Sequence, residues 1–313
     1  MYTTYHGLTR RPFENTPDPL FFYQAKSHGE ALASVEYGIN SGKGLILVVG
    51  DIGTGKTTLV QTLLEKLDPS HVIFRIFNPR HAFRGSAFSS ILDFFVRKLR
   101  LSTTDLNHIE LMEMITNKLE ALDEKRIKTV LIIDEAHLLS DESLQDIRLI
   151  SNIETGKKKL IQIVLVGQLE LITKLKKRSL QATKQRLSII RTLIPFDKNE
   201  TQEYIAHRLR VAGRESPLFN RKALSIVFKK SQGTPRLINQ ICDNSLLIGY
   251  AIEAPLINGA IVKEVISDME PVFERKPSLL TCLIQKLSRP FIFGVVAVLL
   301  ISLVLYVLFF LGY

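Results

Sequence analysis

A glycine-rich loop that ends in Lys-Thr is the feature that most constrains the fold of this chain. Residues 50–57 read Gly-Asp-Ile-Gly-Thr-Gly-Lys-Thr and directly follow the apolar run Leu45 to Val49. Apolar side chains then recur at helical spacing, at Leu59, Val60, Leu63, Leu64 and Leu67. The pattern G-x-x-x-x-G-K-T between a strand and a helix predicts a phosphate-binding loop, or P-loop. The alternative is a glycine-rich turn between two core elements, and the order of strand, loop and helix argues against it.

The residue types in this loop suit a nucleoside triphosphate. Glycines let the backbone wrap closely around a polyphosphate, so that N–H groups and the N-terminus of the next helix point at its negative charge. Lys56 is predicted to reach the β- and γ-phosphates, and the Thr57 hydroxyl is predicted to bind Mg²⁺. We therefore expect ATP to be bound by Gly50, Asp51, Ile52, Gly53, Thr54, Gly55, Lys56, Thr57 and Thr58.

Apolar runs that alternate with helical patterns predict an α/β fold. Helix-spaced apolar positions occur at residues 87–99 and 111–122. Such alternation predicts a five-stranded parallel sheet with helices on both faces, and the site is expected at the carboxyl ends of its strands. The strands are predicted at residues 45–49, 72–77, 129–133, 161–166 and 189–194.

After Pro195 the helical patterns continue without strands, which predicts a small α-helical lid domain. Its helices are expected at residues 200–211, 221–230, 235–252 and 259–269, with Asn220 and Asn258 as N-caps and Gly213 and Gly233 as C-terminal stops. The predicted organisation has five parts: an N-terminal segment over the nucleotide site, the α/β domain, the lid, a juxtamembrane connector and a transmembrane helix. These five parts cover residues 1–27, 28–195, 196–270, 271–289 and 290–311, respectively.

The C-terminal residues predict a membrane span. Phe291 to Leu311 include no charged residue, and only Ser302 and Tyr306 interrupt them as polar side chains. As a helix this stretch is roughly 30 Å long, the thickness of the hydrocarbon core; a buried core helix is the alternative. Basic residues precede the stretch and none follows it. This predicts a single-pass protein of the bacterial inner (plasma) membrane, with a cytoplasmic ATPase domain and its C-terminus outside. Residues 279–287 are a candidate amphipathic helix on the membrane surface.

Composition leaves two classes of partner open. The net charge is +10 and the isoelectric point is about 9.5, which suits contact with membrane lipid or with nucleic acid. The densest basic stretches are residues 157–159 and 174–186, and their default interpretation is a solvated face. Cys242 and Cys282 are isolated and lack metal-ligand spacing, as expected in a reducing cytosol.

Four more polar residues are expected beside the phosphates. The third strand ends in Asp134-Glu135, where Asp134 is placed to hold Mg²⁺ through water and Glu135 to deprotonate the attacking water. Gln168 ends the fourth strand and is expected to position water near the γ-phosphate, unless it is a plain surface loop residue. Arg236, near the start of a lid helix, is expected to fold its guanidinium onto the phosphates, unless it is a solvated residue on a Pro-initiated helix.

These elements in this order, with a helical lid, resemble the AAA+ ATPases. The resemblance becomes more specific at the opening Gly7-Leu8, Pro12-Phe13, Pro17-Asp18-Pro19 and Phe22, at Gly167-Gln168-Leu169-Glu170-Leu171 and at Gly233-Thr234-Pro235-Arg236. Residues 1–269 are similar to the ATPases of the general secretion pathway protein A (ExeA) type, a family that includes ATPases of type IV pilus and exopolysaccharide or exosortase loci.

The resemblance implies roles for particular residues. Gln168 and Arg236 become sensors 1 and 2, and the segment Phe13 to Phe22 lies over the adenine. Asn78 matches a family Asn-Pro that restrains Glu135 until a partner binds. Arg186 is the candidate arginine finger, inserted into a neighbour's site, and Arg191 is the reserve choice. The resemblance thus implies a homo-oligomer and an inner-membrane partner protein. Two departures are Leu169, where family members often have proline, and the expected lack of a periplasmic peptidoglycan-binding region after the span.

Three functions remain open from sequence. The leading hypothesis is a membrane-anchored AAA+ ATPase that couples ATP hydrolysis to assembly of a secretion, pilus or polysaccharide-export machine. The second is a nucleic-acid-binding AAA+ regulator of the transposition-ATPase type, favoured by the basic charge. The third is a nucleotide-dependent scaffold with negligible hydrolysis. The tetrapeptide at residues 134–137 also matches a helicase superfamily, but the residues after Pro195 are too few and too helical for the second RecA-like domain that such helicases need.

Overall fold

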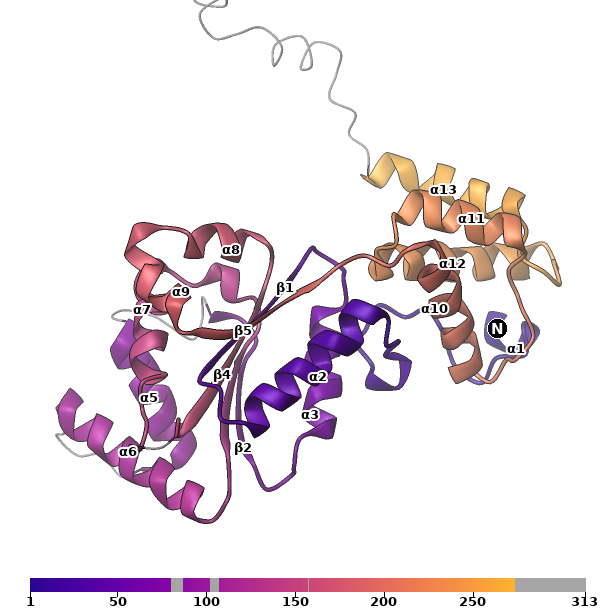
Figure 1. Cartoon of the computed structure of the whole chain (residues 1–313). Helices are drawn as coiled ribbons and strands as arrows, with labels where there is room; N and C mark the ends of the chain where they lie inside the picture. The colour runs from indigo at the N-terminus through magenta and orange to yellow at the C-terminus, as the bar shows by residue number, and fades with distance from the viewer. Residues whose placement is uncertain (80–86, 102–106, 157, 274–313) are drawn as a thin grey trace, which may run out of the picture. The chain divides into compact units, whose positions relative to one another are not determined.

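A parallel β-sheet forms the centre of the computed structural model, which describes residues 1–79, 87–101, 107–156 and 158–273. The chain divides into two units, residues 1–265 and 266–313, and the description below concerns the first unit. The five strands are all parallel in the order β2-β3-β4-β1-β5, which confirms the predicted five-stranded sheet (Figure 1). Their bounds are β1 Leu45–Gly50, β2 Val72–Ile76, β3 Thr129–Ile133, β4 Ile161–Gly167 and β5 Leu187–Leu193.

Alternate residues of the central strands face opposite sides of the sheet, because successive side chains of a strand point in opposite directions. Leu45, Leu47 and Val49 of β1 join one apolar cluster, while Ile46 and Val48 join the other. Both faces are therefore buried, which explains why the sequence shows continuous apolar runs rather than alternation.

Helices cover both faces of the sheet, as predicted. One face packs against α2 (Lys26–Asn40) and α3 (Lys56–Lys66). The other face packs against α5 (Ala87–Leu99), α6 (His108–Glu124), α7 (Asp141–Ile150) and α8 (Glu170–Leu175). Figure 1 shows α2 and α3 on one side of the strands and α7 and α8 on the other. Short elements complete this part of the chain: η1 Pro19–Phe21, η2 Ala136–Leu138, η3 Arg178–Leu180 and α9 Gln181–Gln185.

Beyond β5 the described chain is helical. The helices are α10 Lys198–Val211, α11 Arg221–Ser231, α12 Pro235–Ala251 and α13 Gly259–Phe273. Asn220 accepts a hydrogen bond from the N–H of Ala223, and Asn258 accepts from Ala260 and Ile261. Both predicted N-caps are thus confirmed. We refer to residues 196–265 as the helical segment.

The first residues of the chain attach to the helical segment rather than to the sheet. The first helix, α1 (Tyr2–Tyr5), packs against α12, and the Tyr2 hydroxyl donates to Asp243 over 2.5 Å. The N–H of Thr9 donates to the carbonyl of Ala212 over 2.8 Å. Further along, η1 packs against both α3 and α10, and the chain then enters α2. Residues 1–25, called the N-terminal strap below, therefore bridge the helical segment and the sheet.

The predicted localisation needs correction. Within residues 1–79, 87–101, 107–156 and 158–273, the structure contains no helix that is both long and apolar enough to cross a membrane. The long helices there carry polar faces, as helices of a globular domain do: α12, for example, includes Arg236 and Asp243. The single-pass localisation in the inner membrane is therefore not supported. The predicted span 290–311, the connector, the helix at 279–287 and Cys282 lie outside the described residues.

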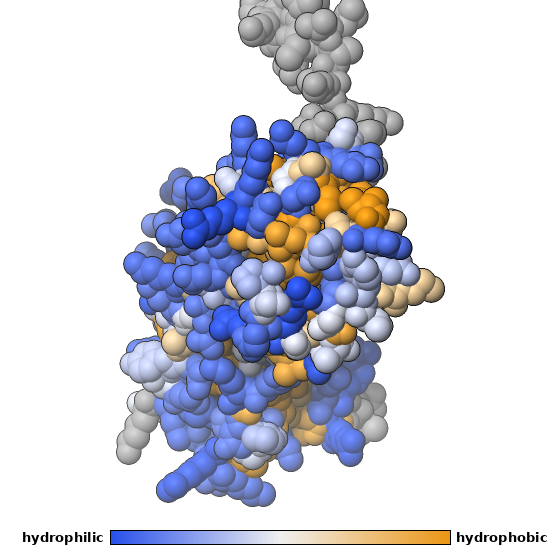
Figure 2. Space-filling view, turned by 90° about the vertical axis from the view of Figure 1, so that its right-hand side faces the viewer, coloured by the Kyte–Doolittle hydropathy of each residue, from blue (hydrophilic) through white to orange (hydrophobic). Residues whose placement is uncertain are grey.

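Most of the helical segment's surface is polar, with some exposed apolar side chains. Figure 2 looks at this side of the molecule, where orange side chains gather among blue ones. Near the end of α12, Leu247, Ile252 and Leu256 are 52, 58 and 42% exposed. These positions contribute little to the core, and so provide controls for core substitutions.

The central strand β4 should dominate stability. Leu165 is fully buried in the larger apolar cluster, and its replacement by alanine leaves a cavity. We expect Leu165→Ala to lower the free energy of unfolding by about 2–5 kcal/mol, measured by urea denaturation. Leu247→Ala, the matched exposed control, should change it by less than about 0.5 kcal/mol. Equal losses in the two variants would contradict this description of the core.

Candidate functional site

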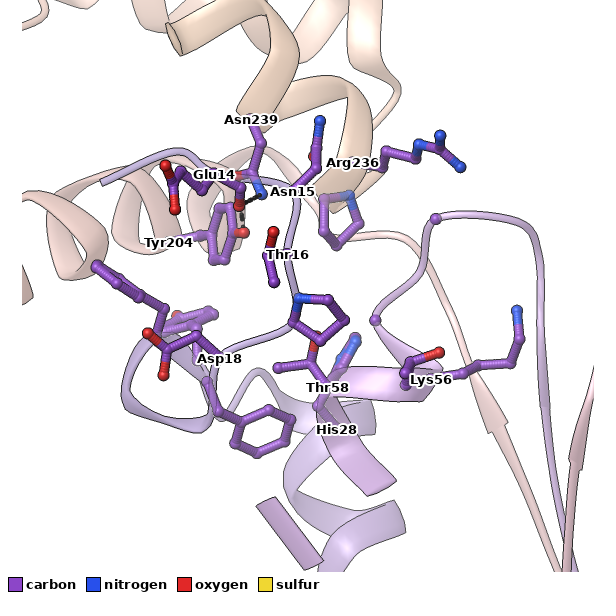
Figure 3. Close-up of a pocket in the computed structure, with 18 of the residues that line it drawn as sticks. Glu14, Asn15, Thr16, Asp18, His28, Lys56, Thr58, Tyr204, Arg236 and Asn239 are labelled. Atoms are coloured by element: carbon purple, nitrogen blue, oxygen red, sulfur yellow. Dashed lines mark hydrogen bonds between the residues drawn. The ribbon is translucent and has the colours of Figure 1, made fainter. Parts of the chain in front are cut away.

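A cavity of about 380 Å³ lies where the P-loop meets the N-terminal strap and the helical segment. Six parts of the chain line it: strap residues 14–18 and 21–23, His28 of α2, P-loop residues, residues that follow β3 and β4, Phe196 after β5, and helices α10 and α12. Figure 3 shows Glu14, Asn15 and Thr16 passing between the helices that carry Tyr204 and Asn239 and the helix that begins at Lys56. The cavity therefore opens at the carboxyl ends of the parallel strands, where the sequence predicts the site.

The P-loop holds a buried ammonium group. Lys56 is 7% exposed, and its Nζ donates to the carbonyls of Gly50 and Asp51 over 2.8 and 2.7 Å. Gly53 and Gly55 have φ angles of +81° and +91°, which L side chains rarely adopt, so the loop needs glycine there. Burial lowers the pKa of Lys56, while Glu135 and Asp134 act to raise it. The loop thus presents a cation together with backbone N–H groups, as phosphate binding requires.

The two predicted Mg²⁺ ligands lie together although 77 positions separate them. The Thr57 hydroxyl donates to Oδ2 of Asp134 over 3.3 Å, and the N–H of Glu135 donates to Oδ1 over 2.9 Å. The described residues include no group of three or more His, Cys, Asp or Glu side chains that would cage a metal by themselves. One hydroxyl and one carboxylate nevertheless suit Mg²⁺, which commonly binds to few protein oxygens and to phosphate oxygens.

Glu135 follows Asp134 and faces the cavity. Its φ of +52° is unusual for a residue other than glycine, and its Oε2 lies 3.5 Å from Nδ1 of His137. A Cβ at Gly167 would lie 3.1 Å from the backbone nitrogen of His137, so β4 closely approaches this turn. The adjacent Gln168 lines the same cavity as Glu135. The structure thus brings the predicted base and the predicted sensor to one cavity.

Arg236 also lies at the cavity, while three other predicted residues do not. The backbone N–H of Arg236 donates to the carbonyl of Gly53 over 3.2 Å, and Figure 3 shows its side chain extending from the start of α12. Arg186 is exposed at the end of α9. Arg191 is exposed on β5 and donates to the Ser34 hydroxyl over 2.9 Å. Neither arginine lines the cavity, and neither does Asn78, two positions after β2.

Several residues at the cavity were not predicted from the sequence. Arg208 is buried in α10, with its guanidinium 4.5 Å from the centre of the Phe21 ring. It donates to the Tyr204 hydroxyl over 2.7 Å and to the carbonyl of Glu14 over 3.3 Å, and Tyr204 donates to Asn239 over 2.8 Å. This network ties the strap to α10 and α12. The i, i+4 spacing of Tyr204 and Arg208 is the only sequence signal for it.

A parallel sheet in this order, with a P-loop after β1 and a carboxylate pair after β3, defines an AAA-type P-loop domain. The family described as AAA domain matches residues 39–175. The sequence is 38% identical over 251 residues to general secretion pathway protein A of Aeromonas hydrophila. This alignment covers 80% of the chain but 45% of the relative, so the chain spans about half the length of the curated relative it matches. The chain thus contains an AAA domain and is related to general secretion pathway protein A, which confirms the resemblance predicted from sequence.

Solved structures support the same fold. The ORC2 protein of Aeropyrum pernix, solved as ADPNP-ADP complexes, has a TM-score of 0.60 at 17% identity, covering 82% of this chain and 71% of that one. Drosophila ORC bound to DNA also has a TM-score of 0.60 at 17% identity, covering 92% and 69%. Cdc6p of Pyrobaculum aerophilum reaches 0.58 at 16% identity, covering 80% and 70%. At these identities the likeness concerns the fold alone.

The buried carboxylate of Asp134 should cost stability in the absence of metal. Burial raises its pKa, which the N–H of Glu135 lowers in part. A raised carboxyl pKa contributes stability at low pH that is lost as the pH rises through the folded-state pKa. We therefore expect Asp134→Asn, without nucleotide or metal, to raise the thermal midpoint at pH 7 by about 2–4 °C. The gain should shrink as the pH falls below the usual carboxyl range.

The matched control is Asp93→Asn, because Asp93 is an exposed carboxylate of α5. The thermal midpoint of Asp93→Asn should match that of the wild type at pH 7 and also below the usual carboxyl range. A lower midpoint for Asp134→Asn at pH 7 would show that the ionised carboxylate stabilises the fold, contrary to this interpretation.

Proposed function

We propose that this chain is a Mg²⁺-dependent ATPase whose active site is the cavity beside the P-loop. The observation that carries the proposal is the contact between Thr57 and Asp134, next to the buried ammonium of Lys56. A plain structural turn does not require a cation, a metal-binding hydroxyl and a carboxylate at one strand edge. Thr57 and Asp134 would hold Mg²⁺, which would supply positive charge to neutralise the phosphates.

Hydrolysis follows from the residues around this centre. Lys56 and the N–H groups of residues 50–58 bind the triphosphate, and Glu135 accepts a proton from the attacking water. The water oxygen forms a bond to the γ-phosphorus as the bond to the bridging oxygen of ADP breaks. Gln168 positions the water, and Arg236 stabilises charge on the phosphates from the helical segment. Residues 13–22 of the strap cover the base.

The division into an α/β domain and a lid is carried forward from the sequence as a proposal. We propose that residues 28–195 form the AAA+ α/β domain and residues 196–270 a lid that moves with the nucleotide state. The hydrogen bond from Arg236 to Gly53 supports this assignment, because it places the start of α12 against the P-loop.

The biological role is proposed from the relationship to general secretion pathway protein A. We propose that ATP hydrolysis drives assembly of a secretion, pilus or polysaccharide-export machine through a partner protein, and that the active form is a homo-oligomer. Arg186, exposed and outside its own cavity, would then complete the site of a neighbouring copy. Asn78 would restrain Glu135 until the partner binds.

A basic chain also admits a nucleic-acid-binding regulator. Lys176, Arg178 and Arg186 are exposed on or near α8 and α9, and the net charge is +10. DNA binding that weakens steeply with salt would favour this second function, because phosphate contacts release counterions. Absence of DNA binding at low salt would eliminate it.

Glu135 should be required for turnover but not for binding. We expect Glu135→Gln to bind ATP with wild-type affinity and to lose turnover by about 10²–10⁴-fold, measured by phosphate release and by equilibrium binding. Glu113→Gln, on the exposed side of α6, is the matched control and should retain full turnover. Turnover at the wild-type rate in Glu135→Gln would sink the assignment of the base, and negligible turnover in the wild type would favour a nucleotide-dependent scaffold.

A trans-acting arginine can be tested by mixing inactive variants. Arg186→Ala should lose turnover in the assembled state, and so should Glu135→Gln. Mixing them should restore part of the activity, because a neighbour's Arg186 then completes a site that retains Glu135. No recovery on mixing, with stable mixed oligomers, would rule out Arg186 as a finger in trans. Arg191→Ala, which alters the reserve candidate on β5, is mixed with Glu135→Gln in the same way for comparison.

A further inference from the structure

A histidine that no motif predicts contacts the P-loop from α2 and also lines the cavity. His28, near the start of α2, is 2% exposed, and its Nε2 lies 2.7 Å from the carbonyl oxygen of Thr54. A Cβ placed on Gly55 would lie 3.5 Å from the same nitrogen. The contact joins α2 to the middle of the loop across 26 positions of sequence.

The surroundings determine which nitrogen carries the proton. A carbonyl oxygen only accepts hydrogen bonds, so Nε2 must donate to Thr54. Nδ1 lies 3.2 Å from the Ser27 hydroxyl, which is then free to donate to it. Burial lowers the pKa of His28, against the hydrogen bond to Thr54 and the charge of Glu200. The imidazole is therefore neutral at pH 7, with its proton on Nε2.

This bond sets the orientation of a peptide group in the loop. In a trans peptide, the C=O and the N–H point in opposite directions. Because the Thr54 carbonyl is directed at His28, the N–H of Gly55 points away from the imidazole, and the proposed function assigns the N–H groups of residues 50–58 to the triphosphate. Donors fixed in advance bind an anion with less ordering cost than donors that must reorient.

We propose that His28 is a positioning residue for triphosphate binding, which acts by holding the Thr54–Gly55 peptide with its N–H toward the phosphates. The inference rests on the proposed function, because it assigns the loop to ATP. It deepens that proposal by placing one determinant of affinity outside the P-loop motif itself.

His28 also contacts the connection to the helical segment. Its ring centre lies 5.1 Å from that of Phe196, the residue after Pro195. The N–H of Phe196 donates to the carbonyl of Gly233 over 2.9 Å, and Gly233 precedes the helix that carries Arg236. One imidazole thus contacts both the P-loop and the link between the sheet and the helical segment, which suits a residue that couples the two.

The competing interpretation is that His28 only fills space between aromatic rings. Two substitutions separate these roles. His28→Phe retains a planar ring but removes the donor, whereas His28→Gln retains an amide N–H at a similar reach and removes the ring. A positioning role predicts that glutamine rescues nucleotide affinity better than phenylalanine, and a packing role predicts the reverse.

The chain contains a matched control. His6 is also a buried histidine, 1% exposed, and its Nε2 lies 3.0 Å from the carbonyl of Leu246 in α12. His6→Phe therefore removes the same kind of hydrogen bond at a place that does not line the cavity. Loss of stability alone should affect the two phenylalanine variants alike.

The test is equilibrium binding of a fluorescent ATP analogue, with the thermal midpoint of each variant recorded. We expect His28→Phe to weaken binding about tenfold or more, equivalent to about 1.4 kcal/mol, with His28→Gln within about threefold of the wild type and His6→Phe unchanged. Wild-type affinity in a folded His28→Phe would overturn the inference, and so would better retention of affinity by phenylalanine than by glutamine.

Two further outcomes keep the test decisive. If His28→Phe does not fold, ¹⁵N NMR of the wild-type imidazole replaces it: a neutral ring protonated at Nε2 supports the inference, and protonation at Nδ1 overturns it. If the folded wild type binds ATP no better than a folded Lys56→Ala variant, the proposed function fails and the inference fails with it. If the wild type binds ATP and a folded His28→Phe binds it equally well, the inference fails while the proposed function stands, so the two failures are distinguishable.

Discussion

The rest of the site depends on one buried charge, the ammonium of Lys56. Removing an ammonium from water is costly unless its hydrogen bonds are replaced, and the carbonyls of Gly50 and Asp51 replace two of them. That arrangement requires a loop that turns through positive φ at Gly53 and Gly55. The sheet order places β4 next to β1 and β3 next to β4, so the carboxylates after β3 come near and favour the charged form of Lys56. The fold can thus be understood as a frame that brings cation and anion to one edge.

The second constraint is the N-terminal strap, which makes the cavity a shared property of the sheet and the helical segment. The carbonyl of Glu14 in the strap accepts from both Arg208 in α10 and Asn239 in α12, while η1 packs on α3. A movement of the helical segment must therefore move the strap, and with it the wall of the cavity. This provides a physical route by which nucleotide contacts can reach the outer surface, with His28 and Phe196 at the junction.

The sequence predicted the parts of this site that rest on local pattern. The P-loop, the five strands and the Asp134-Glu135 pair each occupy a few consecutive residues whose chemistry can be recognised without a structure. The partners of His28, Arg208 and Tyr204 were not predictable, because each contact joins residues that only the fold brings together. Strand ends also differed: β2 stops at Ile76, leaving Phe77 61% exposed. The predicted localisation was wrong: it rested on the hydropathy of residues 291–311 and on the basic residues before them, and the part of the chain that the structure describes contains no helix able to cross a membrane.

The most direct test of the central claim is photolabelling of the full chain with 8-azido-ATP and Mg²⁺, followed by mass-spectrometric mapping of the modified peptides. Since the azide reports on the base, label is expected on residues 13–23 of the strap or on residues 196–208, with excess ATP suppressing it. Label that ATP does not displace, or that maps only to surfaces away from the cavity, would contradict the claim that the P-loop, the strap and the helical segment together form one ATP site.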